Sequence, residues 1–268
     1  MRPVTGETVR GGVTSLTRLS RRQALRRIGT RVGEWRIAAL RTAPVPGTVP
    51  LVLVHGLGVS GRYWRPLAEV LSAYRQVWVP ELPGHGRSDR PGRALEVPLM
   101  ASVLADWMTR VGLGRAVLVG NSLGCQVALE LAVRDPDRVT ALVLAGPTVD
   151  PAARSAGKQI LRLVLSAPPE HPALYPIVVA DYARAGPRQI RGELRAMLRH
   201  RVEAVLPRVT APTLVLRGQF DRVVPRAWAE RATALLPDGR LVEIGFAGHA
   251  AHYSRPRRVA GAVQRFLG

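Results

Sequence analysis

Short apolar runs alternate with amphipathic stretches along most of the chain. The runs have the length and composition of buried strands, whereas the stretches between them repeat apolar residues at helical spacing, as Trp64, Leu67, Ala68 and Leu71 do. The predicted strands are 51–54, 77–79, 116–119, 141–145, 213–216 and 241–244, with a weaker edge strand at 35–42. This alternation predicts an α/β fold with a mostly parallel central sheet covered by helices on both faces.

No apolar run of strand type is predicted between residues 147 and 207, so the alternation of strands and helices is interrupted there. A short helical stretch at 160–165 and a longer one that opens near Pro187, a residue favoured in the first helical turn, take its place. Residues 1–33 are polar, basic and aperiodic, so we expect an arm outside the fold whose removal changes stability little. The predicted parts are a basic N-terminal arm at 1–33, an α/β core at 34–146 and 208–268, and a helical insertion at 147–207.

The formal net charge of +20 raises the question of an anionic partner. Nearly all the basic residues are arginines, with Lys158 the single lysine, and they are scattered along the chain. A codon bias toward arginine explains this pattern better than nucleic-acid binding, for which the sequence contains no reading motif. Weak attraction to anionic substrates or surfaces stays open.

Cysteine usage and hydropathy constrain the setting of the protein. Cys125 is the single cysteine, so no intrachain disulfide forms, and its apolar neighbours predict a buried side chain. The sequence contains no run of 18 apolar residues, which predicts no membrane-spanning helix and no stable membrane insertion. Residues 20–25 resemble a twin-arginine export signal, but no apolar segment follows them, so we expect a cytoplasmic protein.

The apolar run at 116–119 leads directly into Gly120-Asn121-Ser122-Leu123-Gly124, and an apolar helical stretch follows. A strand-to-helix reversal over so few residues forces Ser122 into a strained backbone conformation. Glycines on both sides remove Cβ atoms that would clash. The turn presents the Ser122 hydroxyl at the carboxyl end of a strand and at the positive end of a helix, which indicates a nucleophile.

A nucleophilic serine needs a base, and the base needs a carboxylate that orients it. Asp221 and His249 each follow a predicted strand, and reactive groups of an open α/β sheet gather beyond the carboxyl ends of its strands. Ser122, Asp221 and His249 are therefore the predicted catalytic residues. The backbone amides of Leu123 and of Leu57, which lies in the loop after the strand at 51–54, are the predicted donors to a developing oxyanion.

Other residues compete for these roles. The other histidines are His55, His85, His171, His200 and His252. His252 would lie about one helical turn beyond His249, His55 is expected to support the oxyanion loop, and the two histidines within 147–207 are expected to be exposed. Asp150 competes with Asp221 as the acid, but it lies farther into a loop and would lose more conformational entropy in reaching the histidine.

The chain resembles the α/β-hydrolase superfamily from about residue 35 to its C-terminus. The motifs that carry the resemblance are His55-Gly56-Leu57-Gly58, Gly84-His85-Gly86-Arg87-Ser88, Gly120-Asn121-Ser122-Leu123-Gly124, Gly218-Gln219-Phe220-Asp221-Arg222-Val223-Val224-Pro225 and Gly248-His249. The nearest branch holds esterases, carbon–carbon bond (meta-cleavage product) hydrolases, haloperoxidase-like enzymes and epoxide hydrolases. This resemblance implies a helical cap inserted after the sixth strand, here 147–207. Epoxide hydrolases carry Asp at the position that Ser122 occupies here, so Ser122 argues against that activity.

Motifs and resemblance together predict a serine hydrolase that cleaves an ester or related acyl bond of a small to medium, largely apolar substrate through an acyl-enzyme. Carbon–carbon bond hydrolysis by the same triad is the alternative, although the Trp that such hydrolases often carry after the histidine is absent here. A non-catalytic binding module is a third interpretation. Tyr175, Val178 and Tyr182 are expected either to line an acyl pocket or to form the core of the cap. We expect no metal, no organic cofactor and no nucleic-acid partner.

Overall fold

The structure is a computed structural model, and it describes residues 24–268 of the chain. Its strands are β1 (Arg26–Val32), β2 (Trp35–Arg41), β3 (Leu51–Val54), β4 (Val77–Pro80), β5 (Ala116–Asn121), β6 (Val139–Ala145), β7 (Thr213–Gly218) and β8 (Gly239–Ile244). They form one sheet in the order β1-β2-β4-β3-β5-β6-β7-β8. The pairings β1–β2 and β2–β4 are antiparallel and all others are parallel, which confirms the predicted α/β sheet.

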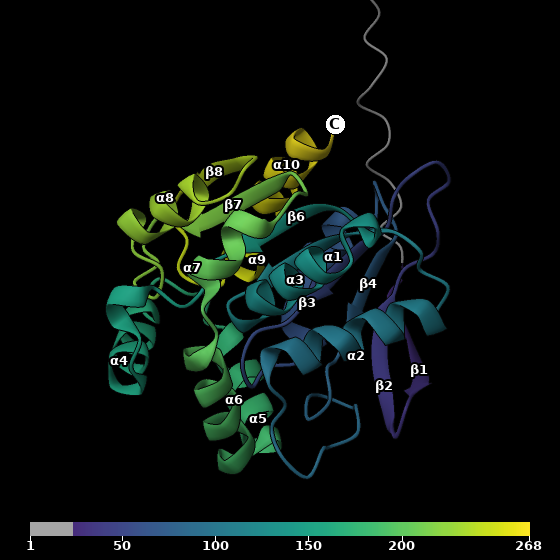
Figure 1. Cartoon of the computed structure of the whole chain (residues 1–268), viewed down its shortest axis with the longest axis horizontal. Coiled ribbons are helices and arrows are strands. Elements are labelled where there is room, and N and C mark those ends of the chain that lie inside the picture. The colour runs from purple at the N-terminus through teal and green to yellow at the C-terminus, as the bar shows by residue number, and fades with distance from the viewer. Residues whose placement is uncertain (1–23) are drawn as a thin grey trace, which may run out of the picture.

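Helices cover the sheet on both faces (Figure 1). The helices are α1 (Arg65–Leu71), α2 (Val97–Arg110), α3 (Leu123–Arg134), α4 (Ala156–Ser166), α5 (Leu174–Ala185), α6 (Pro187–Arg199), α7 (Val202–Val205), α8 (Arg226–Ala234), α9 (Ala251–Ser254) and α10 (Pro256–Leu267). One buried cluster joins the sheet to α2, α3 and α8, and the other joins it to α1, α9 and α10. The two clusters explain why β3 is apolar at every position and why β5, β6 and β7 are apolar at most positions.

The parallel register brings the loops that carry the predicted site to one edge of the sheet. Val54 at the end of β3 pairs with Gly120 of β5, and Asn121 pairs with Ala145 at the end of β6. Gly218 at the end of β7 pairs with Ile244 at the end of β8. Because these strands run in the same direction, the chain leaves all five of them at the same edge.

The boundary expected for the N-terminal arm is wrong, because residues 26–32 form β1. This strand pairs with β2 from Arg26↔Arg41 to Val32↔Trp35, and Arg27 Nη1 lies 3.2 Å from the buried carboxylate of Glu81. An edge strand can carry polar and basic residues that face solvent, so β1 lacks the apolar run that marks the inner strands. The remainder of the predicted arm that precedes residue 24 lies outside the described residues.

The segment between β6 and β7 contains α4, α5, α6 and α7. Both α4 and α5 pack against α6, and the three lie together at one end of the molecule, at the lower left of Figure 1. Two buried acids connect this group to the loop that follows β3. Asp181 Oδ2 accepts hydrogen bonds from the Ser60 amide at 2.8 Å and the Ser60 hydroxyl at 2.7 Å, and Glu193 Oε2 accepts one from Gly58 N at 3.2 Å.

Candidate active site

Ser122 occupies the turn between β5 and α3 with φ 54° and ψ −118°, a backbone conformation that residues other than glycine rarely adopt. The two glycines of the motif are needed because the backbones meet there. A Cβ added to Gly120 would lie 2.5 Å from the carbonyl oxygen of Gly124, and one added to Gly124 would lie 2.2 Å from the carbonyl oxygen of Val54. The turn therefore has the geometry that the sequence motif predicts.

Asp221 and His249 meet beyond the ends of β7 and β8. His249 Nδ1 lies 2.8 Å from Asp221 Oδ2, and the carboxylate is fully buried. The other carboxylate oxygen, Oδ1, accepts hydrogen bonds from the amides of Val223 at 2.9 Å and Val224 at 3.0 Å. These bonds fix the carboxylate, so Nδ1 of the imidazole carries the proton and Nε2 is left as the basic nitrogen.

The electrostatics of His249 are set by burial and by two carboxylates. Burial lowers its pKa, but the charge and hydrogen bond of Asp221, together with a further contribution from Glu170, raise the pKa above the ordinary value of 6.5. Within the described part of the chain, His249 Nε2 is buried and has no hydrogen-bond partner. A free basic nitrogen with a raised pKa suits proton transfer near neutral pH.

Ser122 and His249 both face an apolar cavity of about 390 Å³. The loop after β3 contributes Leu57 to its wall, and the predicted substrate residues Tyr175, Val178 and Tyr182 also line it. The remaining apolar lining comes mostly from α4, α5 and α6, as Ile160, Leu163, Val164, Leu174, Ile190, Leu194 and Met197. The cavity has the size and lining of a pocket for a small apolar ligand.

A hydrogen-bond network fixes the loop that carries Leu57. Gly56 N donates to the hydroxyl of Tyr63 at 2.7 Å, and that hydroxyl donates to Asn121 Oδ1 at 3.1 Å. The Asn121 amide in turn donates to the carbonyl of Ala145 at 2.9 Å. Leu123 N is the first amide of α3, and first-turn amides have no acceptor within their own helix. One predicted oxyanion donor, Leu57 N, therefore belongs to a loop that hydrogen bonds hold in place, and the other, Leu123 N, follows Ser122 directly at the start of α3.

Comparison with known proteins agrees with this fold. The model of the Alpha/beta hydrolase family matches residues 51–262. The chain belongs to the α/β-hydrolase family. It is 28% identical to a protein from Yersinia enterocolitica named as a carbamate hydrolase (RutD), over 83% of this chain and 88% of that one. It is 30% identical to a pimeloyl-[acyl-carrier protein] methyl ester esterase from Xanthomonas oryzae pv. oryzae, over 81% and 94% of the two chains.

Among solved structures, a thermophilic esterase from Thermogutta terrifontis superposes with a TM-score of 0.76 at 26% identity. The match covers 90% of this chain and 98% of that one. The family match and these relatives indicate that this α/β-hydrolase is an enzyme that hydrolyses its substrate.

The residues that competed with the predicted site of this α/β-hydrolase have other partners. Asp150 caps a short helix by accepting a hydrogen bond from Ala152 N, and its other oxygen lies 2.8 Å from Arg162 Nη1. His252 is fully buried between the rings of Tyr63 and Trp64, with ring centroids at 4.5 and 4.1 Å. Neither side chain lines the cavity that Ser122 and His249 share.

The other histidines support loops or pack away from the cavity. His55 Nε2 accepts a hydrogen bond from Leu82 N at 2.9 Å, which connects the loop after β3 to the loop after β4. His85 Nε2 lies 2.9 Å from Glu193 Oε1, and both side chains are buried. His171 is exposed as expected, but the expectation is wrong for His200, which is buried and lies 2.8 Å from Glu130 Oε1.

Glu170 is a site residue that the sequence did not indicate. It lies in the loop between α4 and α5, lines the cavity, and accepts a hydrogen bond from Ala250 N at 2.7 Å through Oε1. Its second oxygen, Oε2, is buried and has no partner among residues 24–268. Burial raises the pKa of this carboxyl, although the Ala250 amide and His249 oppose the shift.

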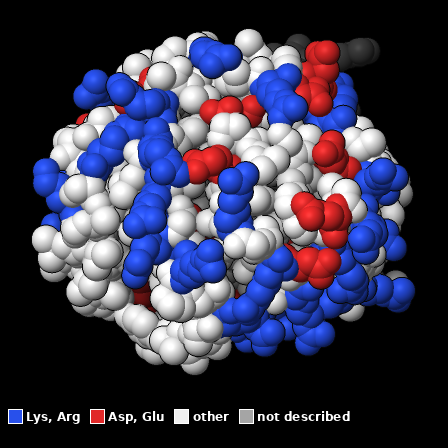
Figure 2. Space-filling model, turned by 60° about the horizontal axis from the view of Figure 1, so that its bottom comes forward, with Lys and Arg blue, Asp and Glu red and all other residues white. Residues whose placement is uncertain are grey.

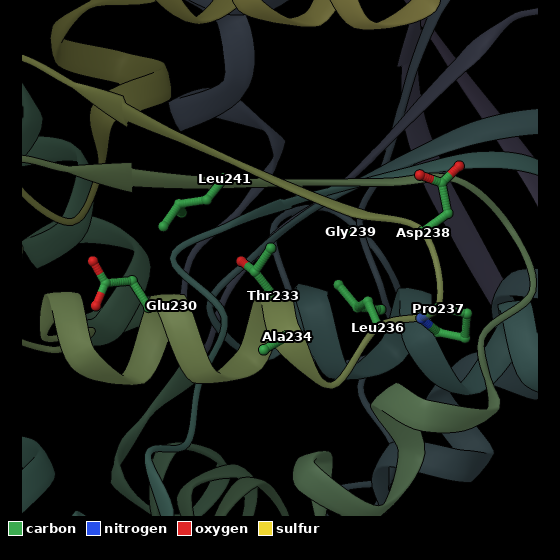
Figure 3. A pocket seen from close by; sticks show the side chains of 8 residues that line it. All are labelled: Glu230, Thr233, Ala234, Leu236, Pro237, Asp238, Gly239 and Leu241. Carbon is green, nitrogen blue, oxygen red and sulfur yellow. The ribbon is translucent and has the colours of Figure 1, made fainter.

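Two hollows lie outside this site. One is lined by α8 and by the turn into β8, with Glu230 and Asp238 at its opposite ends (Figure 3). The described residues that line it include no histidine, serine or cysteine. The other lies on the outer face of α6.

Cys125, the single cysteine, is buried in α3, and burial raises the pKa of its thiol.

The part of the chain that the structure describes contains neither a metal-binding cluster nor a membrane-spanning helix. No group of three His, Cys, Asp or Glu side chains there is arranged to hold a metal ion. No helix within residues 24–268 combines the length and the apolar composition needed to cross a membrane.

Proposed function

We propose that the protein is a serine hydrolase that cleaves an ester or related acyl bond of a small to medium, largely apolar substrate. Ser122 is the nucleophile, His249 the general base and acid, and Asp221 the residue that orients and stabilises the imidazole. The backbone amides of Leu57 and Leu123 donate to the oxyanion. The proposal requires no metal and no organic cofactor.

The reaction has two halves. Ser122 Oγ attacks the carbonyl carbon while His249 Nε2 takes its proton, and Asp221 stabilises the imidazolium that forms. The oxyanion of the tetrahedral intermediate accepts hydrogen bonds from the two backbone amides, and the intermediate collapses when the imidazolium protonates the leaving alcohol. Water then attacks the acyl-enzyme with His249 again as base, which releases the acid and restores the Ser122 hydroxyl.

The observation that carries the proposal is the His249–Asp221 pair at 2.8 Å, with His249 and Ser122 lining one apolar cavity. A positive φ at Ser122 and the tight contacts at Gly120 and Gly124 support its role as the nucleophile. The esterase relative from Xanthomonas, at 30% identity, and the Thermogutta esterase supply further support for ester chemistry.

The insertion at 147–207 acts, in this proposal, as a cap that selects the substrate. Its helices α4, α5 and α6 supply most of the apolar side chains around the cavity, and Tyr175, Val178 and Tyr182 are among them. An apolar wall favours an acyl chain over a charged group because burying an unpaired charge costs free energy. The cavity of about 390 Å³ suits a short or medium acyl chain.

The test combines a covalent probe with a panel of substrates. A fluorophosphonate should label the wild type and the Ser102→Ala variant, a control that removes a serine of α2, but not Ser122→Ala. Hydrolysis of p-nitrophenyl esters of rising chain length should fall by about 10⁴-fold or more in kcat in Ser122→Ala. Near-normal turnover in that variant would refute the serine mechanism. Preference for a vinylogous diketone over every ester would instead favour carbon–carbon bond hydrolysis.

A further inference from the structure

The helix α4 exposes large apolar side chains of a kind that folded proteins normally bury. Its large aliphatic residues are between 44 and 62% exposed: Ile160, Leu161, Leu163, Val164 and Leu165. A concentrated apolar surface of this kind marks a site of contact with another apolar body. The helix has only 11 residues, so it is too short to cross a bilayer, which requires about 20.

The exposed surface of α4 is continuous with the active-site cavity. Ile160, Leu163 and Val164 line that cavity, whereas Leu161 and Leu165 lie one helical turn apart and do not. A ligand that leaves an apolar phase in contact with Leu161 and Leu165 would therefore next meet the cavity-lining side chains of the same helix. Lys158, one turn before Arg162 on the same helix, is exposed and donates to the carbonyl oxygen of Ala152.

The neighbouring helix α6 carries a stripe of arginines on its solvent side. Arg188, Arg191, Arg195 and Arg199 are spaced by three or four residues, so they share one face, and all four are exposed. Together with Arg90 and Arg93 they line a groove of about 690 Å³. Among the described residues that line it, Glu96 is the one acid, and it pairs with Arg199.

Such a stripe is not the scatter that a codon bias produces. Like charges one turn apart on a helix repel each other, and an anionic partner relieves that repulsion. In Figure 2 the end of the molecule that carries α4, α5 and α6 is turned forward, and a band of Lys and Arg runs beside a broad uncharged area. The basic stripe and the apolar helix lie at the same end of the molecule, since α4 packs against α6. The stripe is on the face of α6 that lines the groove, and not on the face that lines the cavity together with α4.

We propose that α4 and the arginine stripe of α6 form a docking surface for an anionic lipid membrane. The aliphatic side chains of α4 enter the interfacial region, and the arginines of α6 lie against lipid phosphates. A basic stripe alone would fit nucleic acid or an acidic protein equally well. The exposed aliphatic helix beside it favours a lipid surface, where one face meets both charge and hydrocarbon.

The test is co-sedimentation of the full-length chain with vesicles of phosphatidylcholine, either alone or mixed with phosphatidylglycerol. The wild type should bind the mixed vesicles and bind phosphatidylcholine much more weakly. The Leu161→Ser/Leu165→Ser variant and the Arg191→Glu/Arg195→Glu variant should each bind the mixed vesicles about tenfold more weakly. Because these side chains are exposed, circular dichroism should show that both variants fold.

The matched control is Arg257→Glu/Arg265→Glu on α10, at the other end of the molecule in Figure 1. It makes the same change in net charge at two exposed arginines and should retain most of the binding. Equal losses in the control and in the α6 variant would overturn the proposal, since net charge alone would then explain binding. Unchanged binding in the α4 variant, with tight binding of a polyglutamate peptide, would overturn it in favour of an acidic protein.

The docking surface and the proposed function can be tested separately. Sedimentation requires no turnover, so the vesicle experiment can be repeated with Ser122→Ala. Loss of esterase activity in that variant with unchanged vesicle binding is the expected result. Vesicle binding that disappears in Ser122→Ala would contradict the docking surface, because Ser122 lies in the cavity and not on the outer faces of α4 and α6.

Discussion

Glu170 accepts a hydrogen bond from the backbone amide of Ala250, and its negative charge raises the pKa of His249. The proposed mechanism needs neutral His249, so kcat/KM should fall as the pH drops below that pKa. Glu170→Gln keeps an acceptor for Ala250 N but removes the charge, and it should move the acid limb of the kcat/KM profile to lower pH. The measurement is the pH dependence of kcat/KM on one p-nitrophenyl ester.

The control for Glu170 is Glu230→Gln, which removes one carboxylate from an exposed pair with Arg226 on α8. Its pH profile should match that of the wild type. A limb that does not move in Glu170→Gln, with activity reduced equally at every pH, would show that Glu170 holds the loop without tuning the histidine.

The choice of acid is tested by two substitutions of equal size. Asp221→Asn offers an amide that can favour the wrong imidazole tautomer, so kcat should fall by about 10⁴-fold, as for the corresponding change in serine proteases. Asp150→Asn loses its ion pair with Arg162 but keeps the acceptor for Ala152 N, and its kcat should be nearly that of the wild type. A crippled Asp150→Asn beside an active Asp221→Asn would reverse the assignment.

Tyr63 is predicted to position the oxyanion loop. Tyr63→Phe removes the acceptor for Gly56 N and the donor to Asn121, so a buried amide loses its partner next to Leu57. We expect kcat to fall by about 10- to 100-fold with a small change in KM, because the amide donors act on the transition state. Tyr74→Phe, a change at an exposed tyrosine, is the control and should be silent. An equal rise in KM with unchanged kcat would place Tyr63 in substrate binding instead.

His252 should make the fold sensitive to acid. Burial, with a further contribution from His249, lowers the pKa of His252 to about 3 from an ordinary value of 6.5. Between these two values the unfolded chain binds the proton and the folded protein does not, so stability falls as the pH falls from 6.5 toward about 3. His252→Leu removes that part of the loss, and the variant should show a smaller drop in melting temperature on acidification.

The comparison for His252 is His171→Leu, a change at an exposed histidine. Its melting temperature should depend on pH as that of the wild type does. An acid-induced loss in His252→Leu as large as in the wild type would show that other groups dominate the acid sensitivity.

The corrected N-terminal boundary gives a prediction of stability. Deleting residues 1–32 removes β1, its ladder with β2 and the contact between Arg27 and Glu81, whereas deleting residues 1–23 leaves them in place. The longer deletion should lower the melting temperature by several degrees relative to the shorter one, because it also leaves a buried carboxylate without that partner. Equal melting temperatures for the two deletions would show that β1 contributes little.

Most strands and helices of the fold could be predicted from short-range patterns in the sequence. The inner strands were predicted because both of their faces are buried, which leaves continuous apolar runs in the sequence. The turn around Ser122 was predicted because a strand-to-helix turn within five residues leaves no room for a Cβ at Gly120 or Gly124. β1 was missed because an edge strand that carries arginines has no such run.

What the sequence did not indicate depends on contacts between distant residues. Glu170 reaches Ala250 across 80 positions, and the proline-rich loop in which it lies gives no sign of that contact. His200 is buried because it pairs with Glu130, 70 positions earlier. Nothing in the sequence around Tyr63 shows that its hydroxyl bridges Gly56 N and Asn121 Oδ1. Such partners are fixed by the tertiary arrangement and leave no periodic signal in the sequence.

The absence of space at Gly124 has a consequence for how this protein can change. A single methyl group there would collide with the carbonyl oxygen of Val54, so the serine turn and the end of β3 tolerate almost no variation. The cavity wall is instead drawn largely from α4, α5 and α6, which lie on a separate stretch of the chain. If the proposed function holds, the residues that break the bond and the residues that select the substrate lie in different segments of the chain. Randomising the cavity-lining positions of those three helices should then change substrate specificity without changing the reaction.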